Sequence, residues 1–460
     1  MNLPKPEIVT CVGLTRSVHA YIMKPRNIIE FQECIILAKK HDLQISSRGG
    51  GNSYTDVFMN SNQMLIDTLN LKSIKNFDSE KGIITVESGV RIGDLIEIIL
   101  PKNWNLVGLS GSMNDRIGGM ISGDTHGKDT WSEGNFGQNV LSLKMLIANG
   151  TIIEIDHDND SELFNAVIGG LGLFGIIIEV TLKLKQIPSF MMQKKSLRIK
   201  TLDDWMEKFY SLDEKEENFA YGIVDPFIRG QSMGRGIMEI GNYIDAPKCS
   251  TEELKKFITT RSRIGPFSPE TFWSIFKRIW GYNTSSLFNK FNYYSPKSKV
   301  IIPFTKFQYV FHNKPKFNLL YAPSGFIEFQ TLFPKKKSAE AISRLISLSQ
   351  SHRRQPWICG VKRHKSDSSY LSFSGDGLSI TMNFPLNNFK KLDREKYSEK
   401  LLDTILEFDG KVYLSKHSFL PKWAFQKMYP EYKKILELKT KYDPEQLFYS
   451  DATKRLLMDS

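Results

Sequence analysis

The chain has 460 residues, of which 41% are hydrophobic and 24% charged, and its formal net charge is +12. A chain of this length and composition is too apolar to be disordered and is long enough for two or three globular units. No nucleic-acid-binding motif accompanies the positive charge, which fits either simple solubility or attraction to phosphate groups and anionic membrane surfaces.

Cysteine usage and hydropathy indicate the compartment. Cys11, Cys34, Cys249 and Cys359 are far apart and form no CxxC pair, so we expect neither a disulfide framework nor a structural metal site. The N-terminus lacks the basic-then-apolar pattern of an export signal, and the most apolar stretch, residues 166–180, is too short to cross a bilayer. We expect a cytoplasmic protein whose membrane contact, if any, is peripheral and at the inner face.

Short strands and helices alternate over residues 1–188. Apolar residues at helical spacing predict a first helix ending near Lys39 and Lys40, and a strand then leads into three glycines. Asn149-Gly150 between two apolar runs predicts a hairpin over 143–155. The other elements expected here are helices at 90–100 and 160–168 and strands at 43–47, 64–68, 83–87 and 175–184.

The remainder of the chain predicts a second unit and a returning tail. A capping pattern at Thr201 and Asp204 opens one helix, and Pro269 after Ser268 opens another. Further expected elements are strands at 325–333 and 378–384, a helix at 400–408, and helical pieces over 424–457 broken at Asp443-Pro444. We predict an α+β fold of two domains: residues 1–188 completed by 413–460, and residues 189–412 built on an antiparallel sheet.

Two glycine motifs resemble nucleotide-binding loops, but their sequence context does not fit such loops. Gly170-x-Gly172-x-x-Gly175 matches a dinucleotide fingerprint, but a predicted helix precedes it and a strand follows, which reverses the order that a Rossmann site needs. Residues 122–129 resemble a phosphate loop, but Ser122 replaces its first glycine and Asp129 replaces the hydroxyl residue that binds magnesium. Neither an NAD site nor an ATPase is therefore expected.

Three glycine segments point instead to one long cofactor. Residues 48–54 (RGGGNSY) follow a strand, and glycines there let backbone N–H groups surround an anion. Residues 111–128 form a second such segment, and 169–172 form a third. A tight turn would explain the first segment alone, but three together favour a phosphate-bearing cofactor lying between subdomains.

These segments carry a resemblance to a known family. Residues 48–56, 118–140 (GGMISGDTHGKDTWSEGNFGQNV) and 163–184, with the C-terminal runs 413–416 and 442–448, resemble FAD-linked oxidoreductases of the vanillyl-alcohol oxidase type, whose FAD domain is called PCMH-type. Within that group, and over most of the chain, the sequence is most similar to the decaprenylphosphoryl-β-D-ribose 2′-oxidases. The resemblance implies that FAD lies at the join of the two domains.

The resemblance also implies roles for individual residues. The expected catalytic residues are Lys416, as a cation beside the flavin, and His126, as a proton acceptor or as a histidine packed against the cofactor. The substrate side is expected to contain Lys128, Glu328, Gln330, Lys362 and Thr381. The expected cofactor-binding residues are Arg48, Gly49, Gly50, Gly51, Asn52, Ser53, Tyr54, Gly111, Arg116, Ile117, Gly118, Gly119, Gly123, Asp124, Thr125, His126, Ile177 and Tyr413.

Three positions depart from the family pattern. Relatives that bind flavin covalently from the glycine loop have a histidine where this chain has Asn52, so we expect non-covalent FAD. Thr381 stands where relatives have a cysteine, and Glu328 stands where they have a glutamine. Glu328 therefore adds a potential charge beside the sugar and a second candidate for the proton acceptor.

The function expected from the resemblance is oxidation of the 2′-hydroxyl of a polyprenyl-phosphoryl-β-D-ribose to a keto sugar. This is the first half of an epimerisation to the arabinose form in cell-envelope polysaccharide synthesis. An NAD(P)-dependent keto-sugar reductase would be the partner that completes it. Two alternatives stay open: an oxidase of free sugars, alditols or aldono-1,4-lactones that uses oxygen, and a non-catalytic flavin-binding subunit.

An aromatic and basic stretch, residues 261–299, stands apart from these motifs. It contains ten aromatic residues between Phe267 and Tyr294, with Arg261, Lys297 and several other basic residues in or beside it. Aromatic and basic residues together suit a lid or a membrane-facing surface, and an ordinary aromatic core with solvated charges is the alternative.

Overall fold

The computed structural model describes residues 2–246, 255, 263–295, 299–311, 314–388 and 391–458. Cys249, Arg261 and Lys297 of the sequence analysis lie outside the described residues. Cys11, Cys34 and Cys359 are buried, and none of the three forms a disulfide with another described residue. Among the described residues, no helix combines the length and the apolar character that a bilayer crossing requires.

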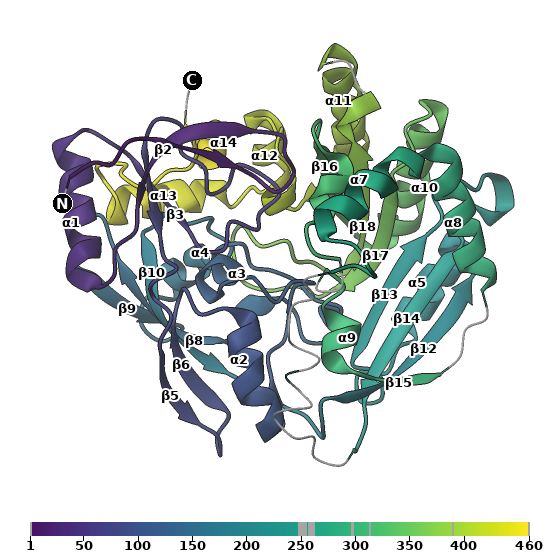
Figure 1. Ribbon diagram of the computed structural model, residues 1–460, viewed down its shortest axis with the longest axis horizontal. Helices are drawn as coiled ribbons and strands as arrows, with labels where there is room; N and C mark the ends of the chain where they lie inside the picture. The colour runs from purple at the N-terminus through teal and green to yellow at the C-terminus, as the bar shows by residue number, and fades with distance from the viewer. Residues whose placement is uncertain are drawn as a thin grey trace.

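The N-terminal part contains two larger sheets (Figure 1), besides a two-stranded pairing of β7 (Trp104–Asn105) with β11 (Lys185–Gln186). A four-stranded sheet has the order β1 (Glu7–Thr10), β2 (Ser17–Met23), β4 (Met64–Asp67), β3 (Ile45–Arg48), with β4 parallel to both β2 and β3. A five-stranded antiparallel sheet has the order β5 (Ile74–Asp78), β6 (Ile83–Glu87), β10 (Ile176–Lys183), β8 (Val140–Leu146), β9 (Ile152–Asp156). Helices α1 (Ile28–Lys40), α2 (Ile92–Ile99), α3 (Ile117–Ser122) and α4 (Ser161–Val167) connect these strands.

The chain returns to this part at its C-terminus, where α12 (Lys422–Met428), α13 (Tyr432–Tyr442) and α14 (Asp451–Leu457) lie beside the N-terminal elements (Figure 1). The Tyr449 N–H donates to the Ile45 carbonyl at 3.0 Å, and Arg455 forms an ion pair with Asp56 at 2.5 Å. Contacts between residues about 400 positions apart therefore close the N-terminal part.

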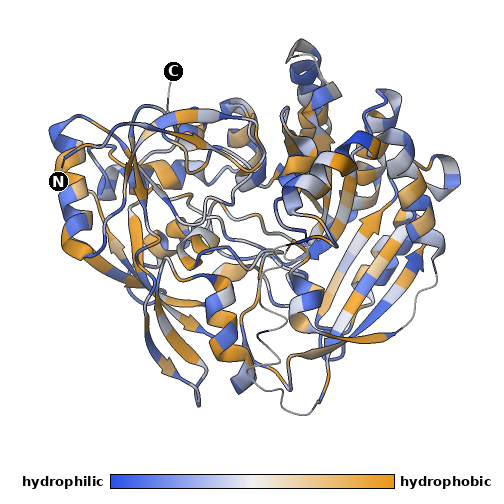
Figure 2. Ribbon diagram, in the orientation of Figure 1, coloured by the Kyte–Doolittle hydropathy of each residue, from blue (hydrophilic) through white to orange (hydrophobic). Residues whose placement is uncertain are grey.

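The middle of the chain forms an eight-stranded sheet that is antiparallel throughout. Its order is β15 (Val300–Pro303), β12 (Met191–Ile199), β14 (Gly236–Tyr243), β13 (Phe219–Val224), β17 (Ile358–His364), β18 (Gly377–Pro385), β16 (Phe326–Pro334), β19 (Lys411–Val412). Figure 2 shows hydrophobic and hydrophilic residues alternating along these strands, the pattern of a sheet with two different faces.

Helices surround this large sheet. Helices α5 (Leu202–Tyr210) and α10 (Ser338–Ser351) pack against it and against each other, and α10 also contacts α11 (Lys391–Glu407). Helix α8 (Tyr282–Tyr294) contacts β14, α9 (Phe304–Gln308) contacts β12 and β15, and α7 (Pro269–Ile279) packs on the short helix η4 (Phe317–Tyr321). The last strands of the sheet meet the N-terminal part through the segment after β19.

Most expected elements are confirmed, and the bounds of some differ. The hairpin turns at Gly150 (φ +84°), a conformation that glycine adopts without strain. Helix α4 precedes the GxGxxG motif and β10 follows it, so the motif's context is the reverse of a dinucleotide fingerprint, as the sequence indicated. The expected helix at 400–408 begins nine residues earlier, at Lys391. The α+β class is confirmed, whereas the domain bounds at 188 and 413 stay a prediction.

Candidate functional site

The glycine loop after β3 is open to an anionic group. Gly51 has φ +65°, and a Cβ on Gly50 would lie 2.9 Å from the Asn114 carbonyl oxygen. Within the described residues, none of the backbone N–H groups from 49 to 53 donates to a protein acceptor. The loop borders a hollow of about 260 Å³ that Arg48 and the three glycines help to line. These unpaired donors fit the pyrophosphate of a dinucleotide cofactor.

The loop is held in place by side chains. The Asn52 amide donates to Asp115 Oδ1 at 2.7 Å, and the Ser53 hydroxyl donates to the Ser415 carbonyl at 3.0 Å. Burial raises the pKa of Asp115, and its hydrogen bonds to Ser110 and Asn52 oppose that shift. Arg48 forms an ion pair with Asp67 at 2.9 Å, so its guanidinium links the end of β3 to the end of β4.

Helix α3 presents a second open surface. No protein atom lies within 4 Å of a Cβ built on Gly119, whereas one built on Gly118 would touch the Ser88 Cβ at 3.0 Å. The Ser88 hydroxyl and Arg116 Nε are buried and have no partner among the described residues. An unfilled space beside unpaired buried polar atoms is what a cofactor-binding surface looks like before the cofactor is added.

The segment after α3 packs tightly. Asp124 is buried, and its carboxylate accepts hydrogen bonds from Asn135 and from the Gly137 N–H. Burial, followed by the charge of Asp367, raises the pKa of Asp124 to about 7. Ile177 is a core residue of β10. The structure thus assigns packing roles to Asp124 and Ile177, and their predicted cofactor contacts stay predictions.

Strand pairing collects the expected substrate-side residues on one face of the large sheet. Directly opposed residues of antiparallel strands point to the same side, and the register opposes Gln330 to Thr381 and Glu328 to Asn383. Alternation along β17 places Lys362 and His364 on this face as well, because Gly360 opposes Thr381. Glu328 and Gln330 are only 6% and 2% exposed, so this polar face is buried against the N-terminal part.

Lys416 meets this face from the short helix η7 (Leu414–Lys416). Its Nζ lies 2.6 Å from Glu328 Oε1 and 4.8 Å from the centroid of the Tyr54 ring. Asn383 Nδ2 donates to the other Glu328 oxygen at 3.3 Å. The ion pair therefore joins the tail, the sheet and the glycine loop at one point.

His126 lies at the other end of the same face. Its Nδ1 is 3.3 Å from Lys362 Nζ, and its ring packs edge-on against Tyr413 at 5.2 Å. Burial, then the charge of Lys362, lowers the pKa of His126 well below its ordinary value, while a hydrogen bond with Gln330 opposes this shift. Burial and the charge of Lys416 lower the pKa of Lys362 to about 7. His126 is therefore neutral, and its Nδ1 lies beside the Lys362 amine.

Lys128 occupies an aromatic box beside these residues. Its Nζ donates to the Phe307 carbonyl and lies 4.1 Å from the Tyr221 ring centroid and 4.4 Å from the Phe307 ring centroid. Burial lowers the pKa of Lys128 to about 7, and the charge of Glu239 opposes this shift.

Three other residues expected at the cofactor make contacts within the protein. Tyr413 donates to the Gly123 carbonyl at 2.7 Å, the Thr125 hydroxyl donates to the Gly108 carbonyl at 3.4 Å, and Gly111 lies against Phe311.

Two polar residues of this site were not among those expected from the sequence. Burial, and then the charge of nearby Glu328, raises the pKa of Tyr321, and its hydroxyl is buried without a partner among the described residues. His364 bonds Ser379 at 2.8 Å and packs 5.1 Å from His126. The period-2 alternation from Lys362 could have identified His364, but nothing in the sequence brings Tyr321 to Glu328.

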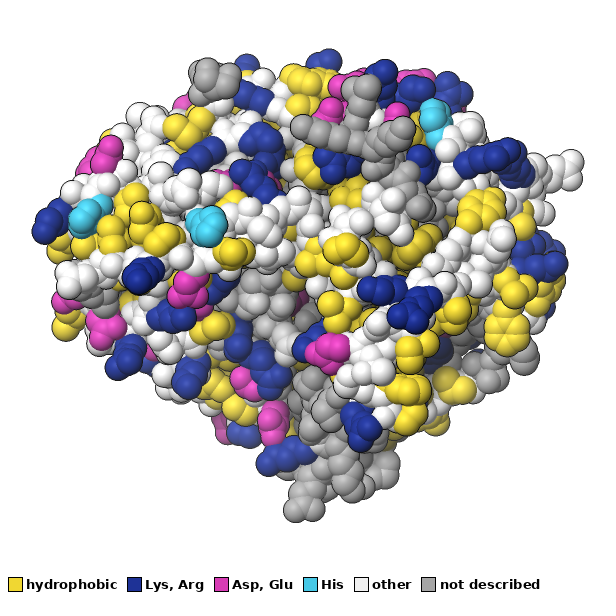
Figure 3. Space-filling model, turned by 45° about the horizontal axis from the view of Figure 1, so that its top comes forward, with side chains coloured by type: hydrophobic (Ala, Val, Ile, Leu, Met, Phe, Trp, Pro, Cys, Tyr) yellow, Lys and Arg dark blue, Asp and Glu magenta, His cyan; other side chains and the backbone are white. Residues whose placement is uncertain are grey.

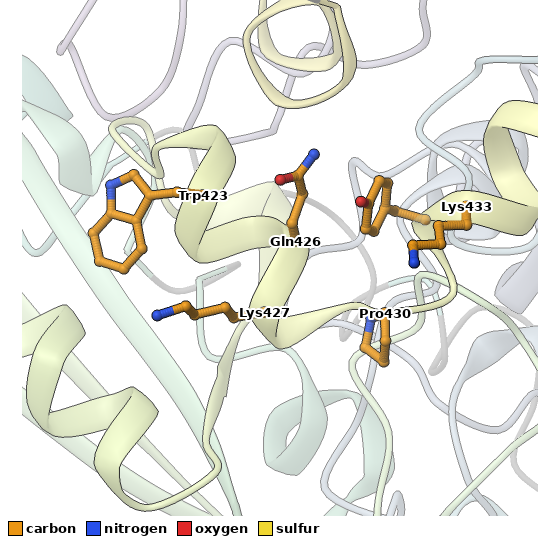
Figure 4. A pocket seen from close by; sticks show the side chains of 6 residues that line it. Trp423, Gln426, Lys427, Pro430 and Lys433 are labelled. Atoms are coloured by element: carbon orange, nitrogen blue, oxygen red, sulfur yellow. The ribbon is translucent and has the colours of Figure 1, made fainter.

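A larger hollow lies elsewhere. It measures about 400 Å³ and is lined by side chains of α12 and α13, including Trp423, Lys427 and Lys433 (Figure 4). None of the expected site residues lines it. The functional site is thus the buried polar face between the sheet and the glycine segments.

Comparisons with known proteins agree with this geometry. Residues 19–156 match the model of an FAD binding domain, and residues 325–456 match that of D-arabinono-1,4-lactone oxidase. A decaprenylphosphoryl-beta-D-ribose oxidase of Mycolicibacterium smegmatis is 26% identical over 90% of this chain and 89% of that protein. An L-gulono-1,4-lactone dehydrogenase of Mycobacterium tuberculosis is 22% identical over 95% of each chain. An L-gulonolactone oxidase of Bos taurus is 29% identical over 43% of this chain and 44% of that protein.

The two matched segments divide the site between them. The first holds the unpaired N–H groups of the glycine loop, His126 and Lys128, and the second holds Glu328, Lys362 and Lys416. The cofactor is FAD. The chain is an FAD-dependent oxidoreductase with the two-domain fold of the vanillyl-alcohol oxidase type, in which a PCMH-type FAD-binding domain is combined with a segment of the D-arabinono-1,4-lactone oxidase type.

Proposed function

We propose that this chain oxidises the 2′-hydroxyl of a polyprenyl-phosphoryl-β-D-ribose to the 2′-keto sugar. The observation that carries the proposal is the buried polar face of Glu328, Gln330, Lys362 and Lys416, which offers donors and acceptors for sugar hydroxyls and positive charge for a phosphate. Similarity over 90% of the chain to a decaprenylphosphoryl-beta-D-ribose oxidase supports the choice of sugar. The keto product would need a separate NAD(P)-dependent reductase to complete an epimerisation.

The side chains of the site divide the chemistry between them. FAD, when bound, supplies the acceptor for the hydride that leaves the carbinol carbon. Lys416 provides a fixed cation where negative charge develops, and a preorganised charge in a water-excluded site stabilises the transition state. Glu328 accepts the hydroxyl proton, because burial and then the charge of Lys362 lower the pKa of His126 well below its ordinary value and make it a poor base. His126 then orients Lys362 and Gln330 toward the sugar.

Oxidation of an aldono-1,4-lactone is a second candidate function. Glu328, Lys362, Thr381 and Lys416 all lie in the segment that matches the D-arabinono-1,4-lactone oxidase model, and a lactone presents a ring of similar size with an oxidisable hydroxyl. The two substrates differ in charge, since only the lipid-linked sugar carries a phosphate.

Anaerobic stopped-flow spectroscopy separates the two candidates. The yellow protein is mixed with polyprenyl-phosphoryl ribose and, separately, with aldonolactones and free alditols, and the bleaching of the flavin absorbance is followed. Rapid bleaching by the lipid-linked sugar alone supports the proposal. Bleaching by lactones or polyols alone assigns the chain to the carbohydrate oxidases instead.

The flavin is expected to be bound without a covalent bond. Asn52 stands at the position from which relatives attach flavin through a histidine, and its amide nitrogen is engaged with Asp115. Acid precipitation of the purified protein should therefore leave the yellow colour in the supernatant. Colour that stays in the pellet after washing would show a covalent attachment from another residue.

Affinity for the phosphorylated sugar is expected to fall as the pH rises. Lys128 and Lys362 each have a pKa of about 7, so both lose their charge above neutrality. The dissociation constant of the anionic sugar should rise roughly tenfold between about pH 6 and about pH 8, whereas that of a neutral lactone should change little. The concentration dependence of flavin bleaching gives both constants. In Lys362→Met the slope should become shallower, and an unchanged slope would exclude Lys362 as a phosphate ligand.

A further inference from the structure

Helix α8 is amphipathic, but it buries its polar face and exposes its apolar face. Its buried residues are polar: Ser285 is fully buried and Asn289 is 8% exposed. Its large apolar residues point outward, with Leu287 67% and Phe291 71% exposed. A surface helix in water normally buries its apolar stripe. The Ser285 hydroxyl has no partner among the described residues, and Asn289 bonds only the Ser285 carbonyl of its own helix, at 2.9 Å.

The exposed apolar surface continues onto α7. Ile275 and Ile279, one turn apart, are 50% and 63% exposed. A row of ring contacts links the two helices: Phe276 stacks on Trp280 at 4.9 Å, and Trp280 meets Phe288 edge-on at 5.6 Å. The alternative interpretation of residues 261–299 as an ordinary aromatic core is thus wrong for α7 and α8, because most of the large apolar side chains of these two helices face outward.

Basic residues border this surface. Lys277, Arg278 and Lys290 are exposed, and the one acidic residue of the two helices, Glu270, is paired with Lys316. Figure 3 shows hydrophobic and basic side chains next to one another on the right-hand side of the molecule, where α8 lies in Figure 1. Exposed apolar side chains with cations beside them match the interfacial region of a bilayer, where rings enter the headgroup boundary and lysines reach lipid phosphates.

We propose that α7 and α8 form a docking surface for an anionic membrane. The charge argues against a second copy as the occupant, because a symmetric contact would place Lys277, Arg278 and Lys290 against themselves. The net charge of +12 favours an anionic partner of large area. The inference stands whether or not the substrate carries a lipid, since it depends on this surface alone.

Docking would bring the functional site close to the bilayer. Helix α7 packs on η4, and the Trp273 Nε1–H donates to the Pro315 carbonyl at 2.9 Å. Tyr321, the last residue of η4, lies beside Glu328 in the site. A lipid-linked substrate could therefore present its sugar to the site while its chain stays in the membrane.

Vesicle co-sedimentation of the flavin-loaded protein tests the proposal. Wild type is expected to bind vesicles of phosphatidylcholine with about one-third phosphatidylglycerol, and to bind pure phosphatidylcholine roughly tenfold more weakly. Leu287→Ser/Phe291→Ser should weaken binding to the anionic vesicles by at least about tenfold. Its matched control is Ile29→Ser/Ile36→Ser on α1, where both side chains are 67% exposed and binding should be unchanged.

A charge-reversal pair completes the design. Lys277→Glu/Arg278→Glu should weaken binding to anionic vesicles far more than Lys183→Glu/Lys195→Glu, which changes the net charge equally at two other exposed lysines.

Retained flavin absorbance in every variant shows that the fold is intact. Equal losses in test and control variants would overturn the proposal, as would no vesicle binding by wild type. Dimers that disappear in Leu287→Ser/Phe291→Ser, without vesicle binding, would assign the surface to a second copy. Substrate bleaching is measured in parallel, so a wrong sugar assignment remains distinguishable from a wrong docking surface.

Discussion

Lys416→Met is expected to slow flavin reduction by the sugar roughly 10²–10³-fold, the usual loss when one preorganised electrostatic contact to a transition state is removed. Lys416 Nζ is the cation nearest to both Glu328 and the Tyr54 ring among the contacts described above, at 2.6 Å and 4.8 Å. Methionine keeps the length and the packing of the side chain but removes its charge. Single-turnover bleaching measures the rate constant directly, without a contribution from product release.

The substitution also affects stability, and this effect has to be separated from chemistry. Removing Lys416 leaves the Glu328 carboxylate, whose side chain is 7% exposed, with Asn383 as its one remaining side-chain partner in the described part of the chain. We expect a loss of about 2 kcal/mol of unfolding free energy, less than the roughly 3–5 kcal/mol of a fully buried pair because Lys416 is one-quarter exposed. Lys416→Met/Glu328→Gln should recover the stability and stay slow.

Glu328→Gln alone gives the matching control. If Glu328 accepts the hydroxyl proton, its amide should slow reduction by roughly 10²-fold with little change in the dissociation constant of the sugar. A rate within threefold of wild type would show that the proton leaves by another route. A Lys416→Met rate within threefold of wild type would contradict the electrostatic role proposed for the lysine.

The sequence was sufficient for elements whose signals are local. The strand-like run at 325–333 predicted β16, Asn149-Gly150 predicted the β8–β9 hairpin, and Thr201 with Asp204 predicted the capping box of α5. Helix α11 was predicted too short, because its first turns, from Lys391, carry mostly polar and charged residues without an apolar periodicity.

Contacts across long stretches of sequence were not predictable in the same way. Lys416 and Glu328 are 88 residues apart, and the pairing of β16 with β19 brings the tail to the sheet. Similarly, Tyr321 reaches Glu328 through the packing of η4, and the reversed faces of α8 depend on which side of the helix meets β14. The family resemblance named Lys416 and Glu328 as neighbours of one cofactor, but it did not show that they form an ion pair.

Substitutions at Gly119 are expected to have opposite effects on the protein with and without FAD. A Cβ there meets no protein atom within 4 Å, and Gly119 lies inside α3, where alanine is favoured over glycine by about 0.5–1 kcal/mol. Gly119→Ala should therefore raise the melting temperature of the FAD-free protein. If the open space is where FAD lies, Gly119→Leu should fold equally well and yet lose most of its flavin.

Flavin content and the FAD-dependent rise in melting temperature measure this second effect. A cofactor held at 100 times its dissociation constant stabilises the folded state by about 2.7 kcal/mol, so its exclusion removes a large shift. We expect Gly119→Leu to retain less than about one-tenth of the wild-type flavin, because the leucine side chain would occupy the space beside Gly119 in which the cofactor would lie. Gly281→Ala is the control, since a Cβ there also meets no protein atom within 4 Å but lies at the start of α8. Full flavin content in Gly119→Leu would place the cofactor elsewhere and would leave the unpaired N–H groups of residues 49–53 as the remaining anchor for FAD.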